Sequence, residues 1–168
     1  MDDADRRADF TAYVSAREQA LARLAYLLTG DRDEAEDLLQ NALAKVYRHW
    51  DRVSAVELPD AYVRRILVNE RNSGWRRMLR RRETPSSHVL EVIEPPSAPG
   101  RDPSVGIDLW RHVQTLPRQQ RAAVVLRYYE DLTEAQTAEI LECSVGTVKS
   151  HTSRAIAALR SKMSEAPA

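Results

Sequence analysis

Side chains with the chemistry of nucleic-acid contacts gather near the C-terminal end of the sequence. Lys149 and Arg154 are cationic, and beside them stand three hydrogen-bonding residues, Thr147, Ser150 and His151. Cations attract phosphates, and Lys, Arg and Ser side chains also bond to base edges in the major groove. The grouping predicts a DNA-binding segment in which one helix presents these side chains together.

The surrounding residues, Leu132 to Arg160, have the spacing of a helix-turn-helix. Thr133 suits the start of a short helix, Ala138 is small where two helices cross closely, and Val148, ten residues later, can anchor the second helix on the first. The N-terminal part of the second helix of such a unit enters the major groove. The alternative is a helical hairpin with a solvated polar face. Glu142 stands at the turn position where glycine is usual, so a positive φ there would carry strain.

A second group of candidates lies in an arginine-rich stretch, residues 64–82, which holds eight arginines against one acid, Glu70. Arginines attract phosphates, asparagine amides pair with base edges, and aromatic rings support unstacked bases. The candidates for DNA contact here are Arg65, Asn69, Asn72 and Arg76. The alternative is a solvated cationic run with Trp75 in the core.

Helical periodicity predicts three helices in the first half of the chain, over residues 10–28, 35–50 and 60–79. Gly30 is placed to end the first helix, and Asp31 is placed to cap the second. Pro59 suits the opening of the third, whereas Gly74 lowers the helix propensity of its second half. These helices would carry the arginine-rich face.

The composition changes between residues 83 and 106, where five of the chain's eight prolines fall among several serines. Prolines fix their own φ and donate no backbone hydrogen bond, so this stretch is predicted to be a linker. Four further helices are predicted after it, over residues 107–115, 118–129, 133–141 and 145–163. The sequence therefore predicts an all-α protein with two small helical domains, residues 1–82 and 107–168, joined by a flexible Pro- and Ser-rich linker.

Composition argues against several other classes of protein. No stretch reaches the roughly 18 apolar residues of a membrane span, and the acidic start differs from a secretory signal, which favours the cytoplasm. Cys143 is the only cysteine, so an internal disulfide and a thiolate metal cluster are excluded. The four histidines lack metal-ligand spacing, and no Gly-rich phosphate loop or nucleophile elbow is present. We expect no enzyme activity, no cofactor and no metal.

In this order the segments resemble an extracytoplasmic-function (ECF) sigma factor, the smallest type of RNA polymerase sigma subunit, over nearly the whole chain. EAEDLLQNALAKVYRHW resembles region 2.2, which binds the polymerase clamp, and LPDAYVRRILVNERNSGWRRMLRRR resembles regions 2.3 to 2.4, which open and read the −10 promoter element. LPRQQRAAVVLRYYEDLTEAQTAEILECSVGTVKSHTSRAIAALR resembles region 4, which reads the −35 element. The resemblance implies binding to core RNA polymerase and promoter DNA to start transcription. In many relatives an anti-sigma factor is a further partner.

The resemblance also implies roles for three groups of residues. The group that binds core polymerase is Asp37, Gln40, Asn41 and Lys45. The group that contacts the −10 element is Arg65, Asn69, Asn72 and Arg76. The group that contacts the −35 element is Thr147, Lys149, Ser150, His151 and Arg154. Asn41 departs from the family, which commonly has glutamate there, and the −10 loop, about residues 51–58, is too variable to assign residue by residue.

One alternative function stays open at this point. A stand-alone helix-turn-helix transcriptional regulator would also explain the C-terminal segment. It would leave the first eighty or so residues, with their arginine-rich helix, without a purpose. A requirement for core polymerase distinguishes the two functions.

Overall fold

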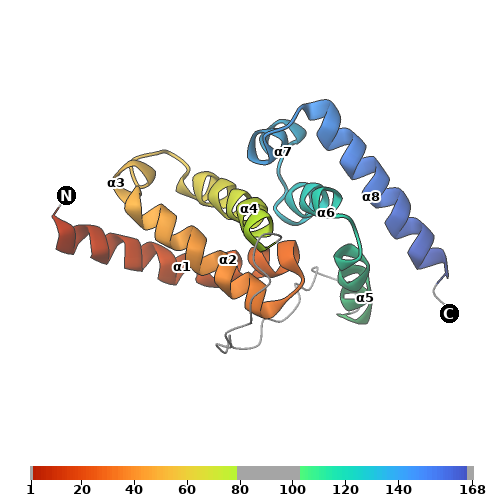
Figure 1. Ribbon diagram of the computed structural model, residues 1–168, viewed down its shortest axis with the longest axis horizontal. Coiled ribbons are helices and arrows are strands. Elements are labelled where there is room, and N and C mark those ends of the chain that lie inside the picture. The colour runs from red at the N-terminus through yellow and green to blue at the C-terminus, as the bar shows by residue number, and fades with distance from the viewer. Residues whose placement is uncertain (1, 79–102, 166–168) are drawn as a thin grey trace. The chain divides into compact units, whose positions relative to one another are not determined.

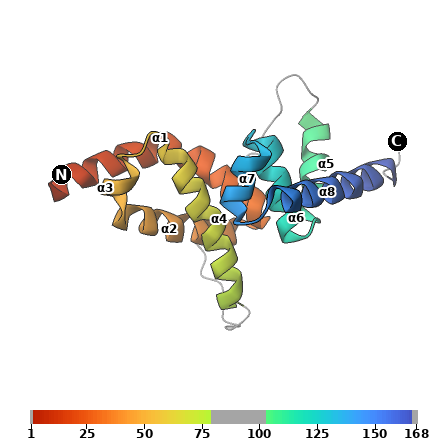
Figure 2. The ribbon, with the colours of Figure 1, turned by 90° about the horizontal axis from the view of Figure 1, so that it is seen from above.

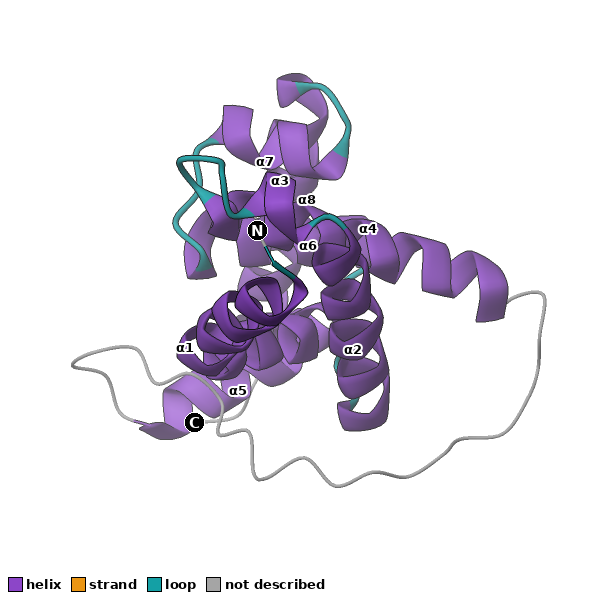
Figure 3. Cartoon of the chain, turned by 90° about the vertical axis from the view of Figure 1, so that its left-hand side faces the viewer, coloured by secondary structure: helices purple, strands orange, loops and turns teal. Residues whose placement is uncertain are grey.

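The computed structural model describes the backbone of residues 2–78 and 103–165 and the side chains of residues 2–73 and 108–165. The described residues form helices joined by turns, with no strand among them (Figure 3). The chain divides into two compact units, Met1–Glu91 and Val92–Ala168. The all-α prediction is confirmed. Most of the predicted linker, residues 83–102, lies outside the described residues.

The described residues of the first unit form four helices, which Figure 1 labels. They are α1 (Asp3–Thr29), α2 (Arg32–Arg48), the short α3 (Trp50–Val53) and α4 (Pro59–Met78). Gly30 ends α1 at φ 79°, a left-handed conformation that glycine adopts without steric cost. The Asp31 carboxylate then accepts a hydrogen bond from the Glu34 N–H at 3.0 Å and caps α2. Both predicted helix boundaries are confirmed, and α4 runs through Gly74 without a break.

The core of the first unit lies between α2, α4 and the C-terminal half of α1. Its fully buried side chains include Leu24, Leu27, Leu28, Val46, Val63 and Leu67. Burying one such side chain stabilises the fold by about 1.5–3 kcal/mol. Residues 2–20 of α1 contribute no buried residue to this core. The N-terminal half of α1 instead lies beside α3, at the end of the unit where the chain passes from α2 to α4 (Figure 2).

The second unit contains α5 (Pro103–Gln114), α6 (Arg118–Val124), α7 (Glu134–Leu141) and α8 (Val145–Glu165). A π-helical turn, η1 (Val125–Tyr129), continues α6. The helix α5 begins four residues before the predicted start at Ile107, which shortens the expected linker. Proline suits a first helical position because its φ is already helical and no N–H bond is needed there. None of the described helices is long and apolar enough to cross a membrane.

Candidate nucleic-acid and polymerase interfaces

The turn of the predicted helix-turn-helix is built by local hydrogen bonds. A reciprocal pair opens α7: Gln136 N–H donates to the Thr133 hydroxyl at 3.1 Å, and Thr133 N–H donates to Gln136 Oε1 at 2.9 Å. Glu142 ends α7 at φ 54° and ψ 44°, and the Cys143 N–H closes the turn on the Ala138 carbonyl at 3.0 Å. The predicted positive φ at Glu142 is therefore confirmed. It costs about 1 kcal/mol relative to glycine.

The start of α8 is fixed by Ser144. Its hydroxyl accepts from the Thr147 N–H at 3.1 Å, and its carbonyl accepts from the Val148 N–H at 3.1 Å. Val148 is completely buried and Ala138 is 6% exposed. The predicted anchoring of the second helix on the first is thus confirmed.

The helix α8 has a buried face and a polar face. Val148, Ala155 and Leu159 are buried, at the spacing of one side of a helix. On another side, positions 147, 150, 151 and 154 share a stripe at the spacing i, i+3, i+4 and i+7. The members of this stripe, which we call the α8 face, are Thr147, Ser150 and Arg154, all exposed, and half-buried His151. The structure therefore brings four of the five predicted −35 residues together.

The fifth predicted residue, Lys149, lies beside the α8 face. Its ammonium forms an ion pair with Glu134 in the first turn of α7, at 3.7 Å. Glu134 was not among the residues predicted from the sequence to act at this site. Within the stripe, the Thr147 hydroxyl lies 2.9 Å from the Ser144 hydroxyl, and His151 Nδ1 is buried with no hydrogen-bond partner among the described residues. Ser150 and Arg154 are thus the members most open to a base or phosphate.

The connection before α7 holds the helix-turn-helix on α6. The Arg127 guanidinium donates to the Leu132 carbonyl, and the Leu132 N–H donates to the Leu126 carbonyl at 3.0 Å. Asp131, between them, has a positive φ of 53°. These bonds join the π-helical turn directly to the start of α7.

The predicted −10 residues lie along one side of α4. Positions 65, 69, 72 and 76 are spaced four, three and four residues apart, so they share a stripe that we call the α4 face. Arg65 is exposed and Asn69 is half-buried. Half-buried Asn72 accepts a bond from Arg71 Nη2 at 3.1 Å through Oδ1, and Arg71 is 3% exposed. The side chain of Arg76 lies outside the described residues. Asn69 differs from Asn72, because its amide has no hydrogen-bond partner within the described residues.

Three of the four predicted polymerase-binding residues lie together on α2. Asp37, Gln40 and Asn41 are all exposed, and they define what we call the α2 face. Gln40 Nε2 is 3.4 Å from Glu36 Oε1, one turn earlier on the same helix. Exposed Arg48 continues the same side of the helix, which the prediction omitted.

Lys45 lies on the flank of α2 that faces α4. Its ammonium pairs with the carboxylate of Glu70, which is 6% exposed. A buried carboxylate needs such a partner because its desolvation is otherwise costly. The structure therefore gives Lys45 a role inside the unit and separates it from the α2 face.

An aromatic cluster that the sequence analysis did not single out joins α1 to the end of α2. The Phe10 ring lies 5.0 Å from Tyr47 and 5.2 Å from Trp50, and the Tyr13 ring lies 5.0 Å from Trp50. Such tilted and edge contacts stabilise by about 0.5–1.5 kcal/mol each beyond area burial. One sequence signal could have revealed the side of α1 that makes these contacts. It is the helical spacing of positions 6, 9, 10, 13 and 17.

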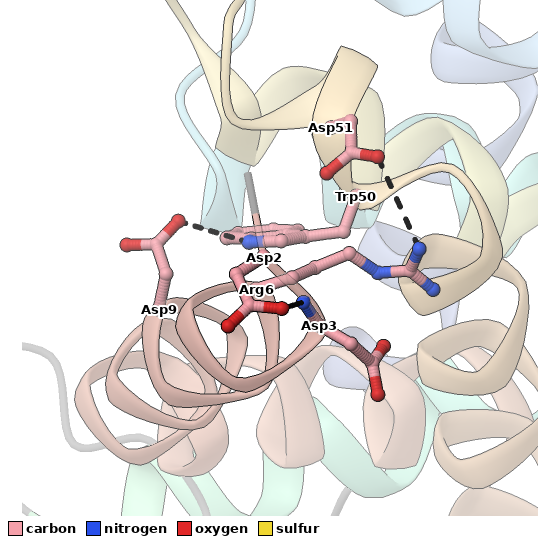
Figure 4. Close-up of polar contacts among 6 residues, drawn as sticks. All are labelled: Asp2, Asp3, Arg6, Asp9, Trp50 and Asp51. Carbon is pink, nitrogen blue, oxygen red and sulfur yellow. Dashed lines mark hydrogen bonds and ion pairs between the residues drawn. The ribbon is translucent and has the colours of Figure 1, made fainter.

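Polar contacts surround the aromatic cluster (Figure 4). Trp50 Nε1 donates to Asp9 Oδ2 at 2.9 Å. The Arg6 guanidinium lies 3.9 Å from the carboxylate of Asp51. It also lies 4.7 Å from the centre of the Tyr47 ring. One turn of α1 therefore contacts the last turn of α2 and both of the first residues of α3.

Asp60, in the first turn of α4, receives two more contacts from α1. The Tyr13 hydroxyl donates to Asp60 Oδ1 at 2.9 Å, and the Arg17 guanidinium lies 3.2 Å from Asp60 Oδ2. Burial, followed by the hydrogen bond to Asp60 and the charge of Asp60, raises the pKa of the Tyr13 hydroxyl well above its usual range. The hydroxyl is therefore a donor at every physiological pH.

Cys143 lies in the turn between α7 and α8 and is half-buried. Burial raises the pKa of its thiol, which lowers the fraction of reactive thiolate at neutral pH. Within the described ranges, no group of three His, Cys, Asp or Glu side chains is arranged to hold a metal ion.

Two family models match the chain, one on each unit. Residues 5–83 match Sigma-70 region 2, and residues 107–159 match Sigma-70, region 4. The RNA polymerase sigma-E factor of Streptomyces avermitilis is 36% identical over 92% of this chain and 85% of its own length. The ECF RNA polymerase sigma factor EcfG of Rhodopseudomonas palustris is 30% identical over 90% of this chain and 81% of its own length. The chain therefore belongs to the sigma-70 family of RNA polymerase sigma factors.

Within that family it is an extracytoplasmic-function sigma factor, which binds core RNA polymerase and directs promoter recognition and transcription initiation. A solved structure agrees with this assignment. The sigma factor RpoE of Bartonella quintana, determined in complex with the anti-sigma factor NepR, matches 95% of this chain and 99% of its own with a TM-score of 0.70 and 26% identity.

Proposed function

We propose that the two units divide promoter recognition between them. The first, about residues 1–82, binds core polymerase and captures the −10 element, and the second, about residues 107–168, reads the −35 element. The observation that carries the proposal is the α8 face, where Ser150, His151 and Arg154 follow one another on the second helix of a helix-turn-helix. That position is the one that enters a major groove.

On the first unit, Asn69 supports a base-reading role for the α4 face. Its amide is half-buried without a described partner, whereas Asn72 is bonded to Arg71. An amide held on a helix can bond to a base edge, and the neighbouring arginines can hold the phosphates. Asn69 is therefore the proposed specificity residue, and Arg65, Asn72 and Arg76 are proposed to set affinity and register.

The α2 face is the proposed contact with core polymerase. Asp37, Gln40 and Asn41 are exposed and engage no other helix of the unit through a described hydrogen bond, so they are open to a partner. Lys45 is proposed to support polymerase binding indirectly, because its ion pair with Glu70 stabilises the unit that carries the α2 face.

The proposed mechanism includes no covalent step in this protein, and we propose that it acts beside polymerase and DNA in the cytoplasm. Unstacking a −10 base costs a few kcal/mol, which binding to the protein must offset. Stacking on aromatic side chains and cationic backbone contacts can supply part of that free energy. Polymerase supplies the rest.

Permanganate footprinting of the −10 strand, with and without core polymerase, tests this division of roles. We expect strand opening only when both core polymerase and the protein are present. Gln40→Ala combined with Asn41→Ala should weaken assembly on core without changing the helix content. Asn69→Ala should leave core binding intact, lower opening and relax the preference at one −10 base. Tight, specific promoter binding without polymerase, and no opening with it, would contradict the proposal.

An anti-sigma factor is a further proposed partner, because RpoE of Bartonella quintana was determined bound to NepR. Such a partner would cover surfaces that polymerase needs. Copurification of the protein from its own cells before and after stress would show whether a bound inhibitor is released. Recovery with polymerase alone under both conditions would contradict this part of the proposal.

A further inference from the structure

One half of α1 contacts both ends of the connection between α2 and α4, residues 49–58, which includes α3. At the start of the connection, Asp9 accepts from the Trp50 indole, and at its end Tyr13 donates to Asp60. Arg17 adds an ion pair to Asp60 at 3.2 Å. The contacts on α1 follow one another at helical spacing, so a single rigid helix fixes the separation of the two ends.

The last part of the connection, residues 54–58, is held locally at its two ends, where the Ser54 N–H donates to the Trp50 carbonyl at 2.8 Å and the Leu58 carbonyl accepts from the Ala61 N–H at 3.2 Å. Its backbone bond from the Val56 N–H to the Val53 carbonyl is long, at 3.4 Å. Val56 is 44% exposed and Leu58 is 67% exposed, so neither side chain anchors the segment in a core. The middle of the segment is therefore the weakly held part, and the contacts from α1 to Trp50 and Asp60 add to the local bonds that fix its two flanks.

The N-terminal half of α1 contributes aromatic contacts to the unit but no buried side chain of its own. Its aromatic side chains pack on Tyr47 at the end of α2 and on Trp50 at the start of α3. Its polar groups contact the start of α3 and the first turn of α4. Polar pairs at half-buried sites contribute little net stability, about 0–1 kcal/mol each. They do fix the relative orientation of the groups they join, because a hydrogen bond forms only within a narrow range of distances and angles.

We infer that Asp9, Tyr13 and Arg17 are positioning residues for promoter opening. They hold Trp50 and Asp60, and so fix the connection and the first turn of α4 before DNA arrives. This inference rests on the proposed role of the first unit at the −10 element. A connection fixed in advance does not lose its freedom on binding, so more of the binding free energy remains for strand capture.

Tyr13→Phe is the sharpest test, because it removes only the hydroxyl and leaves the ring against Trp50. The expected result is a fall of about 2- to 12-fold in −10 opening with core polymerase, which corresponds to the loss of one net hydrogen bond. Binding to core should stay as in the wild type, and the thermal unfolding midpoint should fall by a few degrees at most, so that the protein stays folded at the assay temperature. Tyr26→Phe is the matched control, because Tyr26 is on the same helix about 20 Å further along.

A second pair of variants separates positioning from folding at the other end of the connection. Asp9→Ala removes the acceptor of the Trp50 indole and should lower opening, whereas Asp9→Asn keeps a carbonyl acceptor and should restore it. All variants are compared in the full chain with core polymerase, by permanganate reactivity of the −10 strand.

The inference would be overturned by Tyr13→Phe and Asp9→Ala proteins that open the promoter as the wild type does. It would also be overturned if opening fell only in proportion to lost core binding or lost thermal stability, because the residues would then be merely structural. Failure of the wild-type protein to open the promoter with core would contradict the proposed function instead.

Discussion

The α8 face and the α4 face are both helix surfaces proposed to read DNA, but they are held in place by different means. The helix α8 is fixed by groups close to it in sequence: the Ser144 cap, the turn at Glu142, and buried Val148 against α7. The helix α4 has a buried face against α1 and α2, and it is also fixed by polar groups far from it in sequence, because Lys45 pairs with Glu70 and Tyr13 bonds to Asp60.

The difference suggests how each surface is used. A duplex can be read by a rigid helix whose geometry is complete within about thirty residues. Capture of an unstacked strand requires several segments to hold their positions together, and hydrogen bonds between helices supply that direction. The α8 face should therefore be lost when the core of its unit is disrupted. The α4 face should be lost when the polar contacts between its helix and the other helices are removed.

The largest expected effect comes from breaking the core of the second unit. Val148→Asp places a carboxylate at a completely buried position, and an unpaired buried charge costs several kcal/mol, comparable to the stability of a small domain. Loss of helical circular dichroism and rapid proteolysis of the second unit should follow. Thr147→Asp is the control at the neighbouring exposed position, where a carboxylate suits the first turn of a helix. Equal stability of the two variants would show that α8 does not depend on Val148.

The next effect concerns the polar links of the first unit. Lys45→Ala leaves the Glu70 carboxylate buried without its partner and should lower the free energy of unfolding by about 1–3 kcal/mol. Arg48→Ala, at an exposed position one turn away, should change it by less than about 0.5 kcal/mol. Urea unfolding measures both. Adding Glu70→Gln to Lys45→Ala should recover part of the loss, and no recovery would place the effect of Lys45 elsewhere.

A change of similar size is expected when one contact on the α8 face is removed. Here the quantity is the free energy of DNA binding, not the free energy of unfolding. Arg154→Ala should weaken binding at the −35 element by about 1–3 kcal/mol if the lost contact is to a base. Lys149→Ala should weaken all sequences more evenly and reduce the salt slope by about 1, as a phosphate contact does. Titrations of holoenzyme on matched and altered −35 elements, at several salt concentrations, distinguish the two. Unchanged −35 discrimination in both variants would move recognition to another surface.

A smaller effect of opposite sign is expected from Glu134. Its carboxylate pairs with Lys149, so Glu134→Gln should free the ammonium and tighten DNA binding by about 0.2–1 kcal/mol. The gain should be similar on matched and altered −35 elements. Weaker binding would indicate instead that the ion pair positions Lys149 for contact.

The smallest effect on folding is expected at Gly146. A Cβ at this position would meet only Ser144 Oγ among the described atoms, at 3.8 Å, which is ordinary contact. Gly146→Ala should therefore leave stability unchanged or raise it by up to about 1 kcal/mol. A loss of −35 binding without a loss of stability would show that DNA approaches the backbone here. A clear loss of stability would contradict the described packing of α8.

Local physics let the sequence alone predict much of this protein. The glycine end of α1 at Gly30, the cap at Asp31 and the turn at Glu142 each depend on residues a few positions apart, and the anchor at Val148 depends on Ala138, ten positions away. For the same reason helical spacing puts four of the five −35 candidates on one face of α8, and their role at the −35 element stays a prediction. Helical spacing is enough to determine such a face once the helix is known.

Tertiary structure decided the contacts between segments distant in sequence. Lys45 has the spacing of a surface residue, yet Glu70, twenty-five residues later, draws it into the unit. Asp9, Tyr13 and Arg17 have ordinary helix-surface spacing, and only the packing of α1 against α3 and the first turn of α4 brings them to Trp50 and Asp60. A polar side chain on an exposed helix and one that links two helices have the same local pattern. The partner that distinguishes them is supplied only when the helices pack.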